Sequence, residues 1–343
     1  MAYCWSRRET LIGMAAAAGA SGLPRAQAAV TKLTNSIAGQ GLFYLTNYIA
    51  EDGGFFKKQG LDYQAVNVQS GPQQAAAVLG GSAQISTIGL EQNMHADSHG
   101  GNLVAICASF NAFPMALVVS RKAMQRNHLS LKNSLADNIK RLRGLRIAIS
   151  SPGASTDEFI RTLLIIQGLN PDTQVHLVPV GPGGNMLAAL EAGSVDGFVW
   201  GPPFSTEAAS KGLAEIIVDP MKGTVPQFNN YAYLAITTSR QTLARQRPLL
   251  LAAVRGYTAA MRFAHSEPDQ ARALVRHRFA TMGDGEFKAA FGEFLAGVPK
   301  SPLISEAQFD QTLKTLNLTT KQPLRVTYQQ VVVTDLAHEA LRS

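Results

Sequence analysis

Cysteine is almost absent from this chain of 343 residues, which contains only Cys4 and Cys107. Cys4 precedes an apolar stretch near the N-terminus, a position that does not fit a lipoprotein anchor. If the N-terminal segment is removed, the remaining thiol cannot form an internal disulfide. Because Cys107 lies in an apolar run without a neighbouring base, we expect a small buried side chain rather than a nucleophile.

Sequence motifs for several kinds of chemistry are also missing. The seven histidines include no His-Glu-x-x-His spacing, and we find no nucleophile elbow and no Walker loop. His277 stands between two arginines, which disfavours a metal site. No RNA-binding motif, zinc finger or basic heptad helix occurs. We therefore expect no enzymatic activity, no cofactor, no metal and no nucleic-acid partner.

Long apolar runs are absent from the body of the chain, where none reaches the ~18 residues that a membrane-spanning helix needs. Hydrophobic residues nevertheless make up 46% of the chain, which has enough residues for two domains. The formal net charge is +7, and the basic residues are dispersed. This distribution indicates a solvated basic surface that weakly favours small anions.

The N-terminus has the pattern of an export signal. Arg7 and Arg8 precede a weakly apolar run, Leu11–Leu23, and Ala26-Gln27-Ala28 matches a signal-peptidase cleavage site. We predict that residues 1–28 form a signal peptide and that the mature protein is periplasmic. The paired arginines favour twin-arginine export, with the ordinary Sec route as the alternative.

The next segments alternate between β-rich runs, glycine-containing turns and helical patterns. The predicted strands of this first part are Lys32–Ile37, Asp62–Val68, Gln84–Ile88 and Leu103–Phe110. Such alternation predicts a parallel sheet covered on both faces. Because ligands gather at the carboxyl ends of parallel strands, we expect the turns after these strands to share one edge.

The alternation restarts at Arg146, and from Gln241 onward the chain is mostly helical. Two extended segments, Met115–Ser120 and Tyr231–Thr238, are interpreted as crossovers. We therefore predict an α/β fold of two lobes around a hinged cleft, each lobe a mostly parallel sheet with flanking helices. Lobe 1 comprises residues 29–116 and 236–343 with a helical C-terminal tail, and lobe 2 comprises residues 117–235. Tyr328–Leu341 is predicted to be one helix.

Residues Arg146–Gly168 form the most informative segment. A short strand, the turn Ser151-Pro152-Gly153 and a helix from Ser155 would leave free backbone N–H groups at a helix N-terminus. These groups and the helix dipole suit a small anion. The alternative is a capping box, because Ser155 and Glu158 have the required spacing.

Five motifs, taken in order, resemble those of the solute-binding proteins of nitrate-, sulfonate- and taurine-type ABC importers. They are Gly54–Asp62 (GFFKKQGLD), Ile139–Ala148 (IKRLRGLRIA), Ser155–Gly168, Ala188–Gly197 (AALEAGSVDG) and Trp200–Pro203 (WGPP). The resemblance implies a type II-like periplasmic binding fold, a small-molecule ligand and an ABC permease as partner. We expect a monomer.

The resemblance also assigns ligand-facing turns to positions of this chain. The residues expected to bind ligand are Gln40, Gly41, Phe43, Ser70, Gly71, Gly89, Glu91, Asn111, Phe113, Ser151, Ala154, Ser155, Thr156, Asn185 and Trp200. Hydroxyl and N–H donors in this set would suit a sulfonate, a carboxylate or a similar group. Glu91 is either an acid stabilising its own helix or a partner for an amino group, as in taurine.

Phe43, Phe113 and Trp200 leave a second ligand class open. They either pack within the lobes or form a wall for a pyrimidine or another aromatic compound. Some relatives of this family are enzymes: desulfinases need a cleft cysteine, and pyrimidine-synthesising proteins carry a cysteine-rich stretch. Ser36–Leu42 contains no cysteine, so this sequence favours a binding protein, in the service of either a transporter or a sensor.

Overall fold

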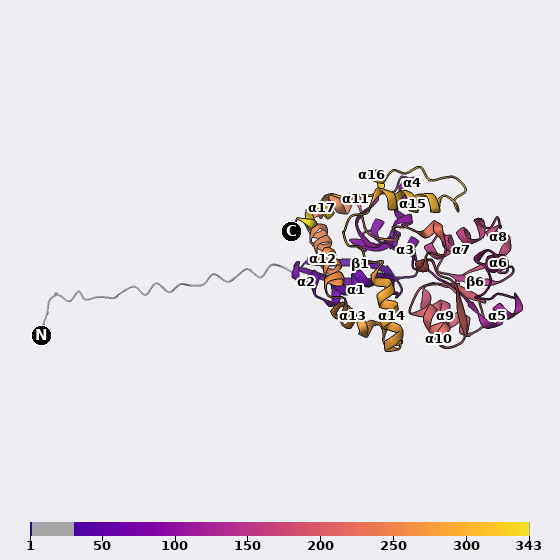
Figure 1. The fold of residues 1–343 in the computed structure, drawn as a ribbon. Helices are drawn as coiled ribbons and strands as arrows, with labels where there is room; N and C mark the ends of the chain where they lie inside the picture. Colours follow the sequence, from indigo (N-terminus) through magenta and orange to yellow (C-terminus); the bar gives the residue numbers. More distant parts are fainter. Residues whose placement is uncertain (2–30, 343) are drawn as a thin grey trace.

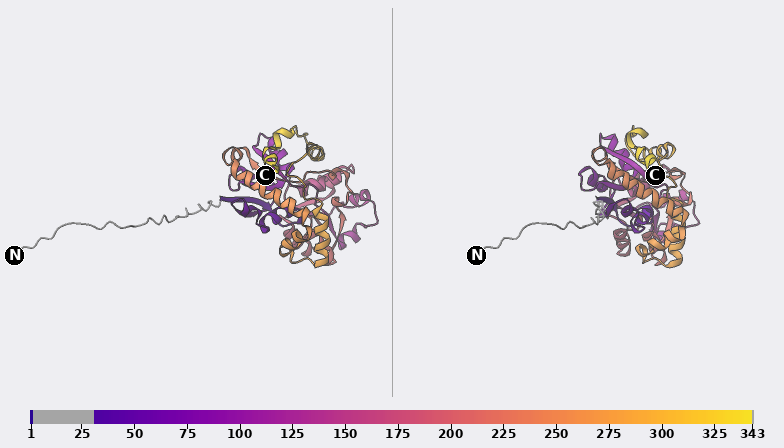
Figure 2. Two further views of the ribbon diagram at one scale, coloured as in Figure 1. Left: turned by 60° about the vertical axis from the view of Figure 1, so that its left-hand side comes forward. Right: turned by 90° about the vertical axis from the view of Figure 1, so that its left-hand side faces the viewer.

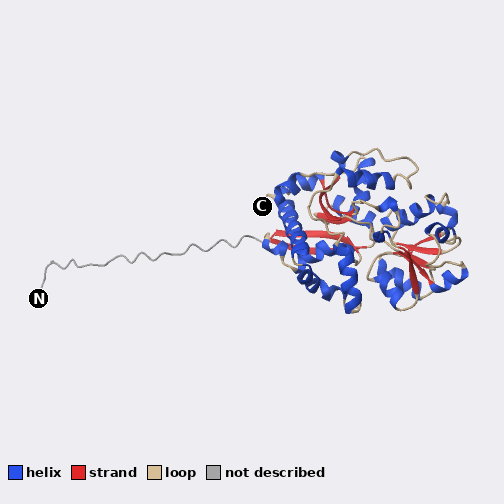
Figure 3. Cartoon of the chain, viewed as in Figure 1, coloured by secondary structure: helices blue, strands red, loops and turns tan. Residues whose placement is uncertain are grey.

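The computed structural model describes Met1 and residues 31–342, and the rest of the predicted signal peptide lies outside the described residues. The described chain forms two five-stranded sheets flanked by helices, which lie side by side in Figures 1 and 3. In each sheet four strands run in one direction and one runs in the opposite direction. The predicted two-lobed α/β class is confirmed. Within residues 31–342 no helix has the length and apolarity that a bilayer crossing requires.

The first sheet has the strand order β2-β1-β3-β10-β4. Its strands are β1 (Thr31–Ala38), β2 (Leu61–Val68), β3 (Ile85–Gly89), β4 (Leu103–Phe110) and β10 (Leu234–Ser239). The segment predicted as a return crossover is in fact β10, which lies antiparallel between β3 and β4. All six of its residues are buried, and this burial on both faces explains their apolar and β-branched character.

The second sheet has the order β7-β6-β8-β5-β9. Its strands are β5 (Leu117–Ser120), β6 (Arg146–Ile149), β7 (His176–Pro179), β8 (Gly197–Val199) and β9 (Ala214–Val218). The other predicted crossover continues into β5, which pairs antiparallel with β8 and β9. Each sheet therefore receives one antiparallel strand from the segment by which the chain enters it, and the prediction of mostly parallel sheets is confirmed.

Helices follow most strands and cover the faces of the sheets. Among residues 31–200 they are η1 (Leu42–Tyr44), α1 (Leu45–Asp52), α2 (Phe55–Lys58), α3 (Gly71–Leu79), α4 (Leu90–Ser98), α5 (Arg121–Arg126), α6 (Leu135–Lys140), α7 (Ser155–Ile165), α8 (Pro171–Gln174) and α9 (Gly183–Glu191). From residue 201 they are α10 (Phe204–Ser210), η2 (Pro220–Lys222), η3 (Pro226–Phe228), α11 (Arg240–Arg245), α12 (Arg247–Ser266), α13 (Pro268–Val275), η4 (Arg276–Phe279), α14 (Asp284–Leu295), α15 (Glu306–Leu316), α16 (Tyr328–Val331) and α17 (Asp335–Leu341).

The helical C-terminal region packs on the first sheet. Helix α12 contacts α1, α2 and α17, while α15 and α16 contact α4 (Figures 1 and 2). The predicted single helix Tyr328–Leu341 is wrong, because α16 ends at Val331 and α17 begins at Asp335. Between them Val332 forms a bridge with Ala105 of β4, and the Val333 N–H donates to the Ala105 carbonyl at 2.9 Å. These β-branched residues therefore pair with the edge of the sheet instead of continuing the helix.

Close packing between α2 and α12 requires a glycine. The buried Phe56 ring stacks on Tyr63, with ring centroids 4.3 Å apart, and meets Tyr257 edge-on at 4.9 Å. A Cβ atom added at Gly256 of α12 would lie 2.7 Å from Cδ1 of Phe56. The Phe56 ring therefore fits against α12 because residue 256 is glycine and has no side chain.

We predict that Gly256→Ala destabilises the protein although alanine favours helix. Overpacking against Phe56 costs about 1–3 kcal/mol, more than the ~1 kcal/mol gained in helix propensity. Gly292 of α14 is the matched control, since nothing lies within 4 Å of a Cβ added there. Gly292→Ala should raise the free energy of unfolding by about 0.5–1 kcal/mol. Urea denaturation measures both, and a stabilised Gly256→Ala variant would contradict this packing.

Candidate ligand-binding site

The turn between β6 and α7 is organised by its own side chains. The Ser150 N–H donates to Oγ1 of Thr156 at 2.9 Å, and the Gly153 N–H donates to Oδ2 of Asp157 at 2.9 Å. Ala154 is the N-cap residue of α7, which makes Ser155 the first helical residue. The Ser155–Glu158 capping box is therefore not formed, because each side chain instead contacts helix α4.

Two backbone N–H groups at the start of α7 remain without a protein partner. Among the described residues neither the Ser155 N–H nor the Thr156 N–H donates a hydrogen bond. The next two N–H groups, of Asp157 and Glu158, donate to the Ala154 carbonyl. Because α7 has eleven residues, the positive end of its dipole adds to these two donors. Together they suit a group that carries negative charge.

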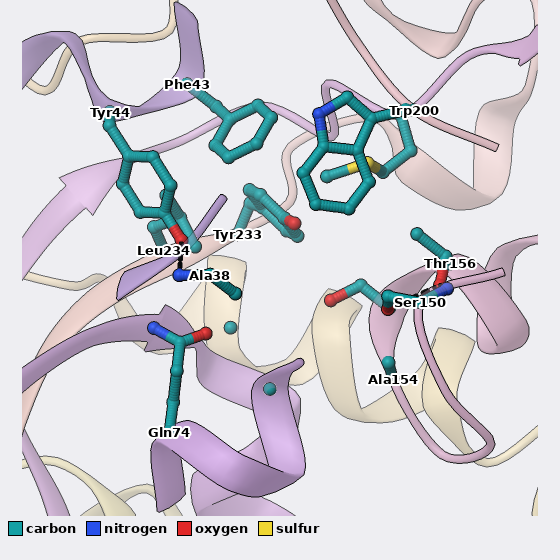
Figure 4. Close-up of a pocket in the computed structure, with 14 residues that line it drawn as sticks. Ala38, Phe43, Tyr44, Gln74, Ser150, Ala154, Thr156, Trp200, Tyr233 and Leu234 are labelled. Atoms are coloured by element: carbon teal, nitrogen blue, oxygen red, sulfur yellow. Dashed lines mark hydrogen bonds between the residues drawn. The ribbon is translucent and has the colours of Figure 1, made fainter. Parts of the chain in front are cut away.

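These two residues face a cavity between the two sheets, shown in Figure 4. Seven of the predicted residues line it: Phe43, Gly71, Gly89, Ala154, Ser155, Thr156 and Trp200. Its volume is about 30 Å³. Such a space admits only one or two water-sized groups, so a larger ligand requires the surrounding loops to move apart.

Seven further lining residues were not among those named as ligand-binding from the sequence: Ala38, Tyr44, Gln74, Met115, Ser150, Tyr233 and Leu234. Tyr44 and Gln74 lie on helices just beyond the predicted turns, so helical spacing from those turns was the signal available. The Tyr44 hydroxyl accepts from the Ala38 N–H at 3.0 Å, and Nε2 of Gln74 donates to the Thr87 carbonyl at 2.7 Å. Tyr233 reaches the cavity only because β10 is inserted into the first sheet.

Aromatic rings form one wall of the cavity (Figure 4). The Phe43 ring lies 4.8 Å from Tyr44, 5.8 Å from Trp200 and 6.2 Å from Tyr233, measured between centroids. All four side chains are buried. No lysine, arginine or histidine is among the lining residues. The positive potential offered to a ligand therefore comes from backbone N–H groups and helix ends.

Glu91 lies beside this cavity with its carboxyl group enclosed. Glu91 is 1% exposed, and the Ser155 hydroxyl donates to its Oε1 atom at 2.5 Å. A Cβ atom added at Gly89 would lie 2.0 Å from Oε1 and 2.2 Å from Oε2, so the carboxyl group rests against the glycine backbone. Oε2 has no hydrogen-bond partner among the described residues. Burial, followed by the charge of Glu158, raises the pKa of Glu91 to about 7 against the opposing effect of Ser155.

Contacts on both sides of the cavity join the two sheets. Between α4 and α7, Nε2 of His95 lies 2.8 Å from Oε1 of Glu158, and Nε2 of Gln92 donates to the Gly153 carbonyl at 2.9 Å. Burial lowers the pKa of His95, but Glu158 outweighs this effect and raises it overall. Burial raises the pKa of Glu158.

On the other side, Nε1 of Trp200 donates to the Gln40 carbonyl at 3.0 Å, and the Leu42 N–H donates to the Pro202 carbonyl at 3.2 Å. Gly39 has a φ of 71°, and a Cβ atom there would lie 2.6 Å from the side chain of Pro182. Only glycine fits where these two turns meet. Contacts on both sides therefore enclose the cavity in this structure.

Some predicted residues lie beside the cavity without lining it. Gly41 precedes η1 and faces the Phe43 ring, and Ser70 is the buried N-cap residue of α3. The Gln40 side chain points elsewhere and donates to the Arg278 carbonyl. The hydroxyl of Ser151 donates to the adjacent Pro152 carbonyl at 3.4 Å.

Three further predicted residues, Asn111, Phe113 and Asn185, do not line the cavity. Asn111 and Phe113 follow β4, which β10 separates from β3, and they line a different pocket of about 380 Å³. The Phe113 ring packs on Phe228 with centroids 4.1 Å apart. Asn185 follows the edge strand β7, and its side chain donates to the Val180 carbonyl at 2.9 Å. Sequence order alone does not reveal which strand ends become neighbours.

Two five-stranded α/β sheets that enclose a cavity between them have the architecture of the periplasmic binding protein fold. Residues 44–277 match the NMT1-like family, and the chain belongs to this family. The nitrate/nitrite binding protein NrtA of Nostoc sp. (strain PCC 7120) is 26% identical over 182 residues. That match covers 48% of this chain and 39% of NrtA, so less than half of the relative is represented.

Solved structures share the fold over nearly the whole chain. A protein from Bordetella bronchiseptica RB50 has a TM-score of 0.79 at 22% identity, covering 91% of this chain and 97% of its own. The alkanesulfonate-binding protein SsuA from Xanthomonas axonopodis pv. citri, bound to MOPS, has a TM-score of 0.65 at 18% identity, with 89% and 99% covered. A mutant of DszB in complex with biphenyl-2-sulfinic acid is more distant, with a TM-score of 0.59 at 18% identity and coverages of 91% and 99%.

The raised pKa of Glu91 predicts a pH-dependent stability. Because this pKa is about 7 in the folded protein against an ordinary value of 4.5, the folded state retains a proton that the unfolded chain releases between these pH values. The free energy of unfolding should therefore fall as the pH rises through this window. Glu91→Gln should make this decrease smaller in urea denaturation, although Glu158, whose pKa is also raised, still contributes to it.

His95→Gln is the control, because His95 also has a raised pKa and loses its proton at higher pH. Its removal should leave the decrease between about pH 4.5 and 7 in place. If Glu91→Gln shows the same slope as the natural protein there, Glu91 is not the group that takes up the proton.

Proposed function

We propose that this chain is a periplasmic solute-binding protein that captures a small anionic molecule between its two lobes and delivers it to an ABC importer. Candidate ligands are sulfonates, taurine-like amino-sulfonates and carboxylates. The observation that carries the proposal is the pair of unpartnered N–H groups of Ser155 and Thr156 at the cavity. Membership in the NMT1-like family and a sequence relative named for nitrate and nitrite binding support it.

The site differs from the sequence-based hypothesis in its donors. The hydroxyl of Thr156 is bonded to Ser150 at 2.9 Å, and the hydroxyl of Ser155 is bonded to Glu91. These side chains therefore position the turn, and the backbone supplies the contacts to the ligand. Anion binding through main-chain amides needs no lysine or arginine, which agrees with the lining of the cavity.

Delivery to a permease requires that the cavity open and close. We propose that residues 29–116 with 236–343 and residues 117–235 move as two lobes, with a ligand stabilising the closed arrangement because it contacts both. The contacts of α4 with α7 and of Trp200 with Gln40 would break on opening. Export through the predicted signal peptide and a monomeric state belong to the same proposal.

A second candidate ligand is a planar aromatic compound such as a pyrimidine. The wall of Phe43, Tyr44, Trp200 and Tyr233 favours it, because a planar ring could stack there once the cavity opens. An enzyme resembling the desulfinases is less well supported. The one described cysteine, Cys107, is buried in β4, and burial raises the pKa of its thiol. A buried, protonated thiol is a poor nucleophile.

Ser155→Pro tests the backbone amide directly. Proline is accepted at the first position of a helix, and the extended conformation of Ala154 (φ −88°, ψ 162°) suits a residue before proline. The substitution removes one N–H from the site. We expect it to bind a sulfonate or nitrate about 10–100-fold more weakly than Ser155→Ala, as a lost hydrogen bond to a charged group implies.

Ser155→Ala is the matched control, because it removes only the hydroxyl and keeps the N–H. Calorimetry gives both affinities, and circular dichroism verifies that α7 is retained. Equal affinities of the two variants would show that the Ser155 amide does not hold the anion.

A further inference from the structure

We propose that this protein binds its anion together with one proton, which is carried on Glu91 as a carboxylic acid that donates to the ligand. The inference deepens the proposed function and rests on it. It assigns to Glu91 a role in specificity for anions of strong acids. Such anions do not bring a proton of their own.

The position of the carboxyl group is the first argument. It lies between Gly89 and Ser155, both of which line the cavity, and it contacts both. Oε1 is already used by the Ser155 hydroxyl, whereas Oε2 is buried and has no partner among the described residues. A buried oxygen without a partner is unfavourable in either protonation state. A ligand in the cavity would supply the missing partner.

The surroundings of Glu91 favour the neutral acid. Helix α7 contributes Glu158, whose negative charge opposes ionisation of Glu91, and α4 contributes His95, which favours it. The other titratable groups nearby are the phenols of Tyr44 from η1 and of Tyr231 and Tyr233 before β10, all uncharged near neutral pH. Burial adds the largest effect, and the pKa of about 7 means that little energy is needed to protonate Glu91.

The charge of the ligand then decides whether Glu91 takes up or releases a proton on binding. An anion held by the Ser155 and Thr156 amides would repel an ionised Glu91 across the Ser155 hydroxyl. The same anion accepts a hydrogen bond from the protonated acid. An ammonium group would instead require the ionised form and would release the proton. The absence of any cationic side chain from the cavity lining favours the first arrangement for a simple anion.

The experiment uses the chain from residue 29 with ethanesulfonate and nitrate as probes, in amine buffers that contain no sulfonate. Calorimetry at about pH 6, 7.5 and 9 should show affinity falling about tenfold per pH unit above the pKa of Glu91. A pH-stat titration at about pH 8 should record uptake of about one proton per bound anion. Glu91→Gln should bind with an affinity that is the same at these pH values and should take up no proton.

His95→Gln separates Glu91 from its titrating neighbour. This variant should still take up the proton, and loss of proton uptake would assign the effect to His95 and overturn the inference. Binding of either anion without proton uptake would also overturn it while leaving the proposed function intact. If ethylammonium binds with proton release and neither anion binds, both the inference and anion capture fail.

Discussion

The hydrogen bond between Ser155 and Glu91 joins the two halves of the molecule beside the cavity. One partner begins α7 after the second sheet's β6, and the other begins α4 after the first sheet's β3. The bond anchors the first turn of α7, whose residues Ser155 and Thr156 line the cavity. It also holds a carboxyl group away from water, which raises the pKa of Glu91. The proposed anion site and its acidic neighbour therefore depend on the same contact.

The chain passes from the first sheet to the second and back again, and these two connections bring Ser155 and Glu91 together. Because β5 follows β4 into the second sheet and β10 returns into the first, both connections run close to the cavity. Met115 and Tyr233, which lie just before these strands, therefore line it. Movement about these connections would separate the lobes without disturbing either sheet, whose central strands β3 and β8 are fully buried. The proposed opening of the lobes would occur at these connections.

The sequence predicted the local elements well but not their neighbours. Leu103–Phe110 has the bounds that were expected, because it has a clear apolar pattern and clear stop signals. The antiparallel roles of β5 and β10 escaped prediction, because an extended apolar segment has the same pattern in a crossover and in a central strand. The same limit affected the site. Asn111 and Asn185 follow strands as expected, yet strand order places them away from the cavity.

Ser155 shows why chemical roles are harder to predict than positions. Its spacing to Glu158 fitted a local capping box, but both side chains make contacts with residues more than 60 positions away. The central claim is that the backbone amides of Ser155 and Thr156 hold the anion. Amide NMR of the labelled protein during titration with ethanesulfonate tests it most directly. The account predicts that these two N–H signals shift more than any others of the β6–α7 segment. Saturable binding that leaves both signals unmoved would contradict it.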